Sequence, residues 1–376
     1  MLPALRRNRS SRVVYTRGGN GTAKSWKVHM TNSTLLGSLL VALGGLSMGS
    51  SPWTLKALRK LQFENWLFVG MCTGLIVVPW GVTLGLCPNA LHALKTVEPL
   101  VIVKSNIFAL GWGIANVLCC IGFVRIGVVL TGGILGGLGL SLGVMTPMVF
   151  KASGLFRQAP DLLSRPGKIV LAGVAAMLVG VVLVSLAGFG RNRALIKAQK
   201  TSQGFLGGLV MVVIAGILST GPNFAFAYSQ DPIIKAVKAQ GAGDIASTFA
   251  VWAVGMLSGA MVNILFPAYL MSKHKSWHLL RDSWRETALP FIGGVQFVLA
   301  IVLLGNGNLM LGALGASVGW GIYQAMQILG GQAVGFASGE WKGIFGTPRQ
   351  QIYVAIIIFL LATVVMGYGN SLVRVS

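Results

Sequence analysis

Five amide side chains and three aromatic side chains stand inside long apolar stretches of this sequence. They are Trp112, Asn116, Asn223, Asn263, Gln296, Trp320, Tyr323 and Gln324. A buried amide needs hydrogen-bond partners, and it can both donate to and accept from a sugar hydroxyl. An indole adds a flat apolar face with one donor. Amides and rings without charge suit a neutral polyol, and hydrogen bonding between helices is the alternative role for each residue.

Two of the aromatic residues stand four positions before an amide. Asn116 follows Trp112, and Gln324 follows Trp320 at the same spacing. Residues four apart project from one face of a helix. We therefore expect both pairs to line one central cavity, together with Asn223 and Asn263.

Acidic residues are scarce, and none of the eight stands in the middle of an apolar stretch. A carboxylate within the membrane would be the natural proton carrier. Proton coupling, if present, is therefore expected to depend on Glu98 or Glu340, which stand nearest the hydrocarbon. Arg125 is a candidate gate or anion contact, with an interfacial snorkelling arginine as the alternative. The other acids and the four histidines are expected to be solvated.

Catalytic chemistry has little support in the sequence. It contains no phosphate loop, HExxH or serine-triad motif, and its four cysteines form no CxxC or His/Cys pair. We predict no enzyme activity, no cofactor and no metal. The net charge of +22 comes from Lys and Arg in the tail and in loops between apolar blocks. That distribution argues against binding of nucleic acid.

Composition shows which elements must hold these residues. Hydrophobic residues make up 54% and charged residues 10% of the chain, whereas a soluble domain carries roughly a quarter charged residues. The apolar blocks match the ~20 residues that a helix needs to cross a bilayer. We predict an all-α polytopic membrane protein embedded in lipid, with spans near 34–53, 66–86, 102–122, 126–150, 168–188, 204–228, 247–271, 288–305, 309–337 and 351–372.

The ten predicted transmembrane helices divide into two similar halves. Each half begins with a helix that a Gly/Ser-rich segment and a proline interrupt, and each has a tight hairpin between its third and fourth spans. These features are Gly44 to Gly49 with Pro52, Gly216 to Gly221 with Pro222, and hairpins at Val124-Arg125 and Asn306 to Asn308. Five spans per half force opposite orientations. The sequence therefore predicts two inverted five-helix repeats, residues 31–190 and 191–376.

Residues 1–30 precede the first predicted span and are strongly basic. Residues 1–29 hold seven Lys and Arg and no acid. They fit a disordered tail, a start codon placed upstream of Met30, or a basic targeting arm. Loop Lys and Arg residues favour one side as cytoplasmic, but the tail cancels that difference and leaves the orientation open.

Short motifs follow one another along residues 30–372. They are Pro79-Trp80, Pro88-Asn89, Trp112 to Asn116, Arg125 to Gly127, Met145 to Pro147, Gly216 to Gly221, Val262-Asn263, Trp320 and Glu340-Trp341. In their order and spacing the sequence resembles the L-rhamnose–proton symporter family, a branch of the drug/metabolite transporter superfamily.

The resemblance implies a fold of two inverted repeats and uptake of a sugar such as L-rhamnose by proton symport, across a bacterial inner membrane. One segment differs, because residues 294–300 are mostly aliphatic where family members are rich in aromatic residues. We therefore expect a secondary transporter of a neutral small solute. The alternatives are a carrier or exporter of a different small metabolite and, less favoured, a membrane enzyme or signalling protein.

Overall fold

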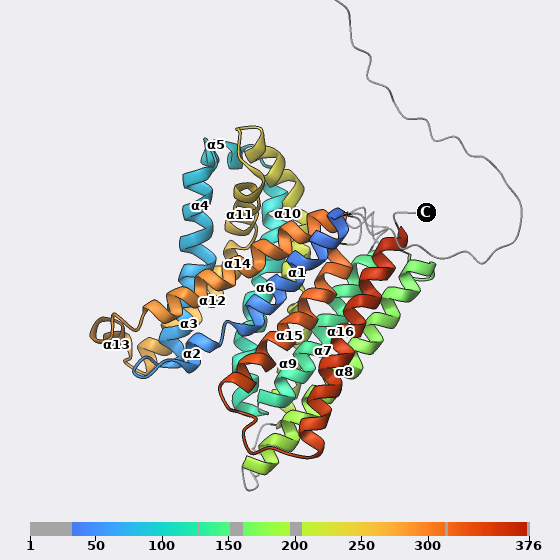
Figure 1. Cartoon of the computed structure of the whole chain (residues 1–376). Helices are drawn as coiled ribbons and strands as arrows, with labels where there is room; N and C mark the ends of the chain where they lie inside the picture. The colour runs from blue at the N-terminus through green and yellow to red at the C-terminus, as the bar shows by residue number, and fades with distance from the viewer. Residues whose placement is uncertain (1–31, 127, 151–160, 196–204, 313–314, 374–376) are drawn as a thin grey trace, which may run out of the picture.

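The computed structural model describes residues 32–126, 128–150, 161–195, 205–312 and 315–373. All regular elements in these ranges are helices (Figure 1). In chain order they are α1 (Asn32–Ser50), α2 (Trp53–Lys56), α3 (Phe63–Met71), η1 (Cys72–Val77), α4 (Val78–Leu86), α5 (Ala90–Lys95), α6 (Pro99–Arg125), α7 (Val128–Val149), α8 (Arg165–Leu195), α9 (Phe205–Leu218), α10 (Gly221–Lys238), α11 (Asp244–Gly255), α12 (Leu257–Lys273), α13 (Trp277–Asp282), α14 (Ala288–Leu311), η4 (Gly315–Gly319), α15 (Trp320–Ala337) and α16 (Thr347–Val373).

Many of these helices, alone or joined to the next element in the chain, are long and apolar enough to cross a membrane. Eight candidate spans occur among the described residues, and the bent pair α11 and α12 makes a ninth if it is one span. Helix α15 is not among them, because Gln324, Gln327 and Gln332 lower its hydropathy. The prediction of an all-helical polytopic membrane protein is confirmed.

Both predicted interruptions are present. Helix α1 ends at Ser50 and α2 begins at Trp53, while α9 ends at Leu218 and α10 begins at Gly221. The local chemistry is the same at each break. The Ser51 hydroxyl donates to the Met48 carbonyl at 2.8 Å, and the Ser219 hydroxyl donates to the Gly216 carbonyl at 2.7 Å. A proline without an N–H follows each serine closely, so the helix cannot continue unchanged.

A third break was not predicted. Helices α11 and α12 meet at an angle of 63° between Gly255 and Leu257. Two side chains of α6 bind the polar groups that the bend leaves free. The Ser105 hydroxyl donates to the Gly255 carbonyl at 2.7 Å, and Asn106 accepts the backbone N–H of Ser258 at 2.9 Å. The sequence around the bend gives no warning because its stabilising partners belong to another helix.

The predicted hairpin at Asn306 to Asn308 is wrong. Helix α14 continues through these residues to Leu311, and the Asn306 amide donates to the Val302 carbonyl of its own helix at 2.9 Å. The helix is terminated at Gly312, whose φ is +69°. Glycine adopts this left-handed conformation without a Cβ clash, which is common just after a helix.

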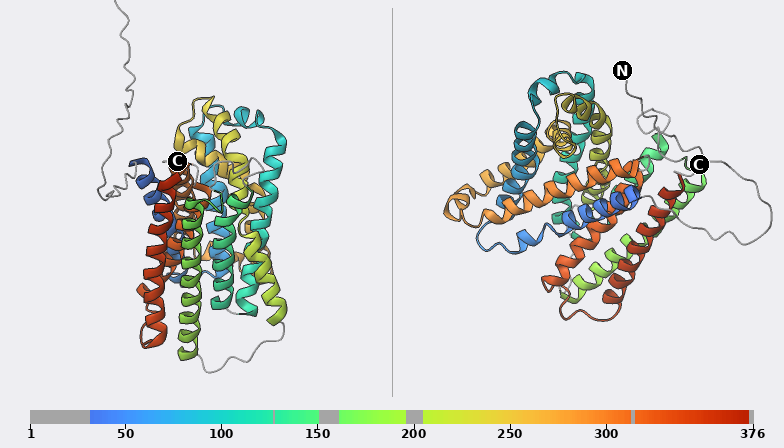
Figure 2. Two further views of the ribbon diagram at one scale, coloured as in Figure 1. Left: turned by 90° about the vertical axis from the view of Figure 1, so that its right-hand side faces the viewer. Right: turned by 45° about the horizontal axis from the view of Figure 1, so that its top comes forward.

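Helices from the first half of the chain pack mainly against helices from the second half. Helix α1 lies along α14 and α15, α8 pairs with α16, and α6 contacts α9, α10 and α12 (Figures 1 and 2). Buried residues form two large apolar clusters, one centred on α7, α8, α15 and α16 and the other on α5, α10 and α11. This interleaving brings both Trp/amide pairs to the centre of the molecule.

Candidate functional site

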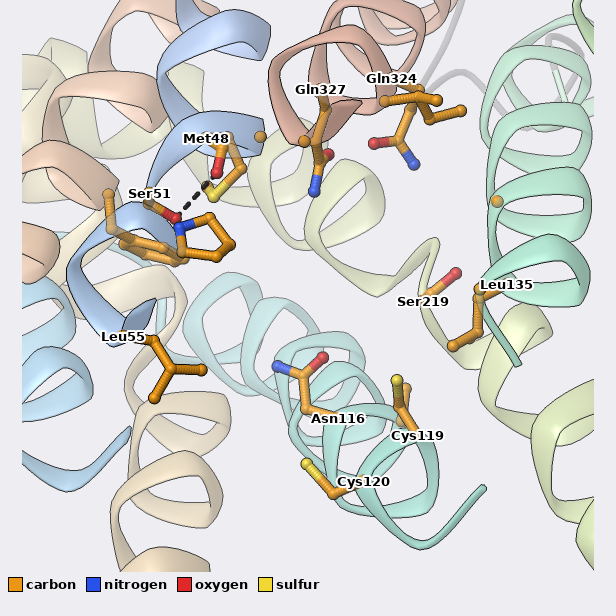
Figure 3. Close-up of a pocket in the computed structure, with 18 of the residues that line it drawn as sticks. Met48, Ser51, Leu55, Asn116, Cys119, Cys120, Leu135, Ser219, Gln324 and Gln327 are labelled. Carbon is orange, nitrogen blue, oxygen red and sulfur yellow. Dashed lines mark hydrogen bonds between the residues drawn. The ribbon is translucent and has the colours of Figure 1, made fainter. Parts of the chain in front are cut away.

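A cavity of about 850 Å³ lies between the helices of the two apolar clusters (Figure 3). Its volume falls in the range typical of sites for small molecules. Lining residues come from α1 to α3, η1, α6 to α8, α10 to α12, α14 and α15, and from the segments that join some of them. Both halves of the chain therefore form one shared cavity.

The ends of the lining helices show where the cavity opens. Phe63 stands at the start of α3, Phe123 and Arg191 stand near the ends of α6 and α8, and Glu340 follows α15. These ends meet at the lower side of the molecule in Figure 1. Deeper lining residues come from the middle of helices. We call the region at these helix ends the mouth. We call the deep region the floor; it is formed by Met48, Trp252, Met256, Ile301 and Leu304.

The Trp/amide pair of α6 forms one wall. Asn116 directs its amide into the open space (Figure 3) and donates to the Asn263 side-chain oxygen at 2.8 Å. Asn263 in turn donates to the Gly259 carbonyl at 2.8 Å. An amide has two donors and an acceptor oxygen, so Asn116 keeps its oxygen and one N–H for another partner. Trp112 lines the cavity one turn deeper.

The corresponding pair of α15 forms the opposite wall. Trp320 is buried, donates its indole N–H to the Gly139 carbonyl at 3.1 Å and stacks on Tyr323 at 5.9 Å between ring centroids. Gly143 makes room for the indole, because a Cβ there would lie 2.1 Å from Trp320 Nε1. Gln324 projects into the cavity (Figure 3) and has no hydrogen bond to another described residue.

Two predicted residues, Asn223 and Gln296, do not line the cavity, which corrects the expectation for Asn223. Gln296 donates to the Ser47 carbonyl and the Ser50 hydroxyl at 2.8 and 2.9 Å, and it accepts the Trp53 indole N–H at 2.9 Å. Asn223 donates to the Gly143 carbonyl at 3.0 Å. Gln296 ties α14 to the break after α1, and Asn223 ties α10 to α7.

Charged groups gather at the mouth. The Glu340 carboxylate forms ion pairs with Lys56 of α2 and Arg191 of α8. The Arg191 guanidinium also lies over the Trp341 ring at 5.5 Å. The cluster joins three segments that are distant in the sequence. It is the only ionised part of the cavity lining in the described part of the chain.

The other two charged candidates lie elsewhere. Glu98 precedes the first residue of α6, at the end opposite the mouth, and its side chain is exposed. Arg125 is the last residue of α6 and is also exposed. Neither side chain lines the cavity.

Not all remaining acids are solvated, contrary to expectation. The side chain of Glu64 is only 8% exposed, and it contacts His274 Nδ1 at 2.9 Å and the Ser276 hydroxyl at 3.2 Å. This contact ties α3 to the end of α12. A buried carboxylate needs such partners, but they stand more than 200 positions away and leave no local signal.

Glu286 closes a second contact on the same face. Its carboxylate accepts backbone N–H groups of Arg59, Lys60 and Leu61, which precede α3. Burial raises the pKa of this carboxyl, but these hydrogen bonds and the Lys60 charge outweigh burial, so the pKa of Glu286 lies below its ordinary value. The carboxylate therefore holds the loop between α2 and α3.

Several lining residues were not among the site residues predicted from the sequence. They are Ser219, Trp252, Gln327, Gln332 and Trp341. Gln327 stands three positions after Gln324, a spacing that marks one helix face and could have identified it. The described residues contain no group of three or more His, Cys, Asp or Glu side chains able to hold a metal ion.

Apolar helices around a central cavity, with neutral amide and indole walls, define a membrane transporter of small solutes. A family model described as L-rhamnose-proton symport protein (RhaT) matches residues 30–372. The chain belongs to this family and is a secondary transporter, not an enzyme.

Named relatives support the assignment. An L-rhamnose-proton symporter of Pectobacterium atrosepticum is 27% identical over 351 residues, which cover 91% of this chain and all of the relative. Symporters of the same name from Pectobacterium carotovorum and an Escherichia coli strain are 26% and 25% identical, with the same coverage.

Proposed function

We propose that this protein carries L-rhamnose, or a neutral sugar of similar shape, together with protons across a bacterial inner membrane. The observation that carries the proposal is the uncharged wall of amides and indoles in the cavity. Six of the eight predicted residues line it, namely Trp112, Asn116, Asn263, Trp320, Tyr323 and Gln324. The relatives named for L-rhamnose supply the sugar.

The helix contacts support ten spans in two inverted repeats. Helix α1 contacts α14 and α15, and α9, in the matching place of the second half, contacts α6 and α7. Helices α8 and α16, the last of each half, contact each other. Counting α15 as a span gives ten, with repeats at residues 31–190 and 191–376. A central site between such repeats is typical of secondary transporters.

We assign the coupling role to Glu340 rather than to Glu98. Only Glu340 lines the cavity, and its partners Lys56 and Arg191 connect α2 and α8. Protonating Glu340 would leave two like charges side by side, so proton binding and separation of these segments must accompany each other. The three side chains are between 20% and 37% exposed, which allows exchange with water.

The basic loops at the mouth support a cytoplasmic position for this side of the protein. They carry many of the basic residues, namely Lys56, Arg59, Lys60, Lys273, Lys275, Arg281, Arg285 and Lys342. Short loops rich in Lys and Arg stay in the cytoplasm. On this proposal the described conformation is open to the inside of the cell.

Uptake by energised vesicles tests the function. Labelled L-rhamnose should accumulate in vesicles that contain the protein, and adding unlabelled L-rhamnose should dissipate the pH gradient. Other neutral sugars compete in proportion to their similarity. Binding of none of these sugars, or accumulation without proton movement, would contradict the proposal.

A pair of variants tests the coupling residue. Glu340→Gln should bind sugar but fail to accumulate it or move protons, since its side chain cannot change charge. Glu98→Gln is the matched control and should retain coupled uptake. Full coupling in Glu340→Gln, or its loss only in Glu98→Gln, would remove Glu340 from this role.

A further inference from the structure

Several polar side chains of the cavity lining have no hydrogen-bond partner within the described chain, and they are of two kinds. The indole nitrogens of Trp252 and Trp341 are unpaired and are also shielded from the open space. The polar atoms of a second set are unpaired but not shielded in this way. This set consists of Trp112, Tyr323, Gln324, Gln327 and Gln332. Four of its five members belong to α15.

Gln324 and Gln327 are neighbours on one face of α15. Both side chains are half-buried and point into the open space (Figure 3). Gln332 stands more than a turn closer to the mouth. Polar side chains in the interior of a membrane protein are costly and commonly mark the path of a substrate. Gln324 and Gln327 therefore give a solute in the cavity two adjacent amides.

Each of the two amides lies beside a different helix break (Figure 3). Gln327 is on the side of the break after α1, where Gly49 packs so closely that a Cβ there would overlap the Gln327 carbonyl oxygen. Gln324 is on the side of the break after α9. A Cβ at Gly139 would lie 3.5 Å from Gln324 Nε2 and 2.9 Å from the Ser219 hydroxyl oxygen. The pair thus faces the space between the two breaks.

The polar groups of the breaks have partners of their own. After α1, the Met48 carbonyl accepts the Ser51 hydroxyl at 2.8 Å. After α9, the Ile217 carbonyl accepts the Thr220 hydroxyl at 2.9 Å. The two glutamines form no hydrogen bond to these groups or to any other described residue. They are therefore not used as hydrogen-bonding links between helices, which is the usual structural role of an amide in a membrane protein.

Two amides one turn apart match two neighbouring hydroxyl groups of a sugar ring. The Cβ atoms of residues three positions apart in a helix are about 5–6 Å from each other, and the flexible glutamine side chains can converge from that spacing. An amide can donate through its N–H groups and accept through its oxygen, and a hydroxyl can do both as well. Each amide can therefore bind one hydroxyl in either direction.

We propose that Gln324 and Gln327 bind adjacent hydroxyls of one sugar ring, and that Gln327 thereby selects sugars that keep both hydroxyls of this diol. This inference rests on the proposed function, since it assumes a sugar in the cavity. Water satisfies both amides before the sugar enters, so each contact exchanges one hydrogen bond for another. The net contribution of each amide to affinity is therefore modest.

Binding of L-rhamnose to the purified full-length protein tests the role of Gln327. Gln327→Met keeps an unbranched side chain but removes the amide, and it should weaken binding about threefold to tenfold, the loss of one hydrogen bond. Its unfolding temperature should equal that of the parent, because no described residue bonds to the amide. Gln350→Met is the control, since Gln350 is exposed on α16 outside the cavity; it should bind normally. Normal binding by Gln327→Met would overturn the inference.

Deoxy analogues of L-rhamnose test whether the two hydroxyls are adjacent. An analogue that lacks a contacted hydroxyl should bind the parent weakly, with little further loss in the variant that lacks the matching amide. Gln324→Met and Gln327→Met should match two different analogues, whose missing hydroxyls belong to neighbouring ring carbons. One shared analogue, or hydroxyls on separated carbons, would overturn the inference and leave the proposed function intact. A parent protein that binds no neutral sugar would overturn both.

Discussion

The two Trp/amide pairs share one spacing but use their polar groups in opposite ways. In α15 the indole N–H is used within the protein, because Trp320 donates to the Gly139 carbonyl. The Gln324 amide has no partner among the described residues. In α6 one amide N–H is used within the protein, because Asn116 donates to the Asn263 side chain. The Trp112 indole has no hydrogen bond within the described chain.

This difference separates anchoring from recognition. A polar group that the protein already satisfies contributes mainly to stability, whereas a group left for the cavity contributes to binding. The α15 pair should therefore be anchored by its ring and recognise substrate through its amide. The α6 pair should recognise substrate through its ring and share its amide between both roles.

The largest expected effect is on stability, from Trp320→Ala. Trp320 is 7% exposed, and truncating a buried tryptophan costs about 3–5 kcal/mol. Its thermal unfolding temperature in detergent should fall well below that of the parent. Trp112→Ala, at the half-buried partner position, should unfold nearer the parent temperature and lose sugar affinity. Equal destabilisation by both variants would erase the distinction between the pairs.

A smaller effect is expected from Gly143→Ala. The new Cβ would overlap Trp320 Nε1 at 2.1 Å, and forcing extra atoms into a packed site costs about 1–3 kcal/mol. Gly132→Ala in the same helix is the control, since no atom lies within 4 Å of its Cβ position. Unfolding temperatures of the two variants should differ clearly. Matching values would show that Trp320 is not anchored where α7 holds it.

The smallest effects should distinguish the two amides. Gln324→Leu should weaken sugar binding by the ~0.5–1.5 kcal/mol of one hydrogen bond and leave unfolding unchanged. Asn116→Leu should weaken binding about threefold or more and also lower the unfolding temperature, because Asn263 loses its donor. Calorimetric binding and thermal unfolding measure both. A stability loss in Gln324→Leu alone would reverse the assignment.

Hydropathy was sufficient to predict the helical class, and Gly/Ser-rich segments followed by a proline predicted the interruptions after Ser50 and Leu218. They failed where side chains from distant segments decide the backbone. Ser105 and Asn106 support the bend after Gly255, and Asn306 bonds within α14 instead of starting a turn. A local pattern contains no information about partners that the fold brings together.

The same reason explains the candidate site. Periodicity placed Trp112 with Asn116 and Trp320 with Gln324 correctly, because i, i+4 spacing fixes a shared helix face. It could not separate Gln296, whose amide is occupied by α1, from Gln324, whose amide is not. Trp252 was overlooked because no local pattern shows that the fold brings it to the cavity.

The glutamines of α15 also bear on how the protein is assembled in the membrane. Helix α15 is less apolar than the eight candidate spans, so lipid alone is a poor environment for it. Its main neighbour is α1, which lies far earlier in the chain and also packs against α14. Helix α1 must therefore remain accessible in the bilayer until α14 and α15 emerge from the ribosome. We therefore expect α15 to insert after α1 and α14, against helices that are already in the membrane.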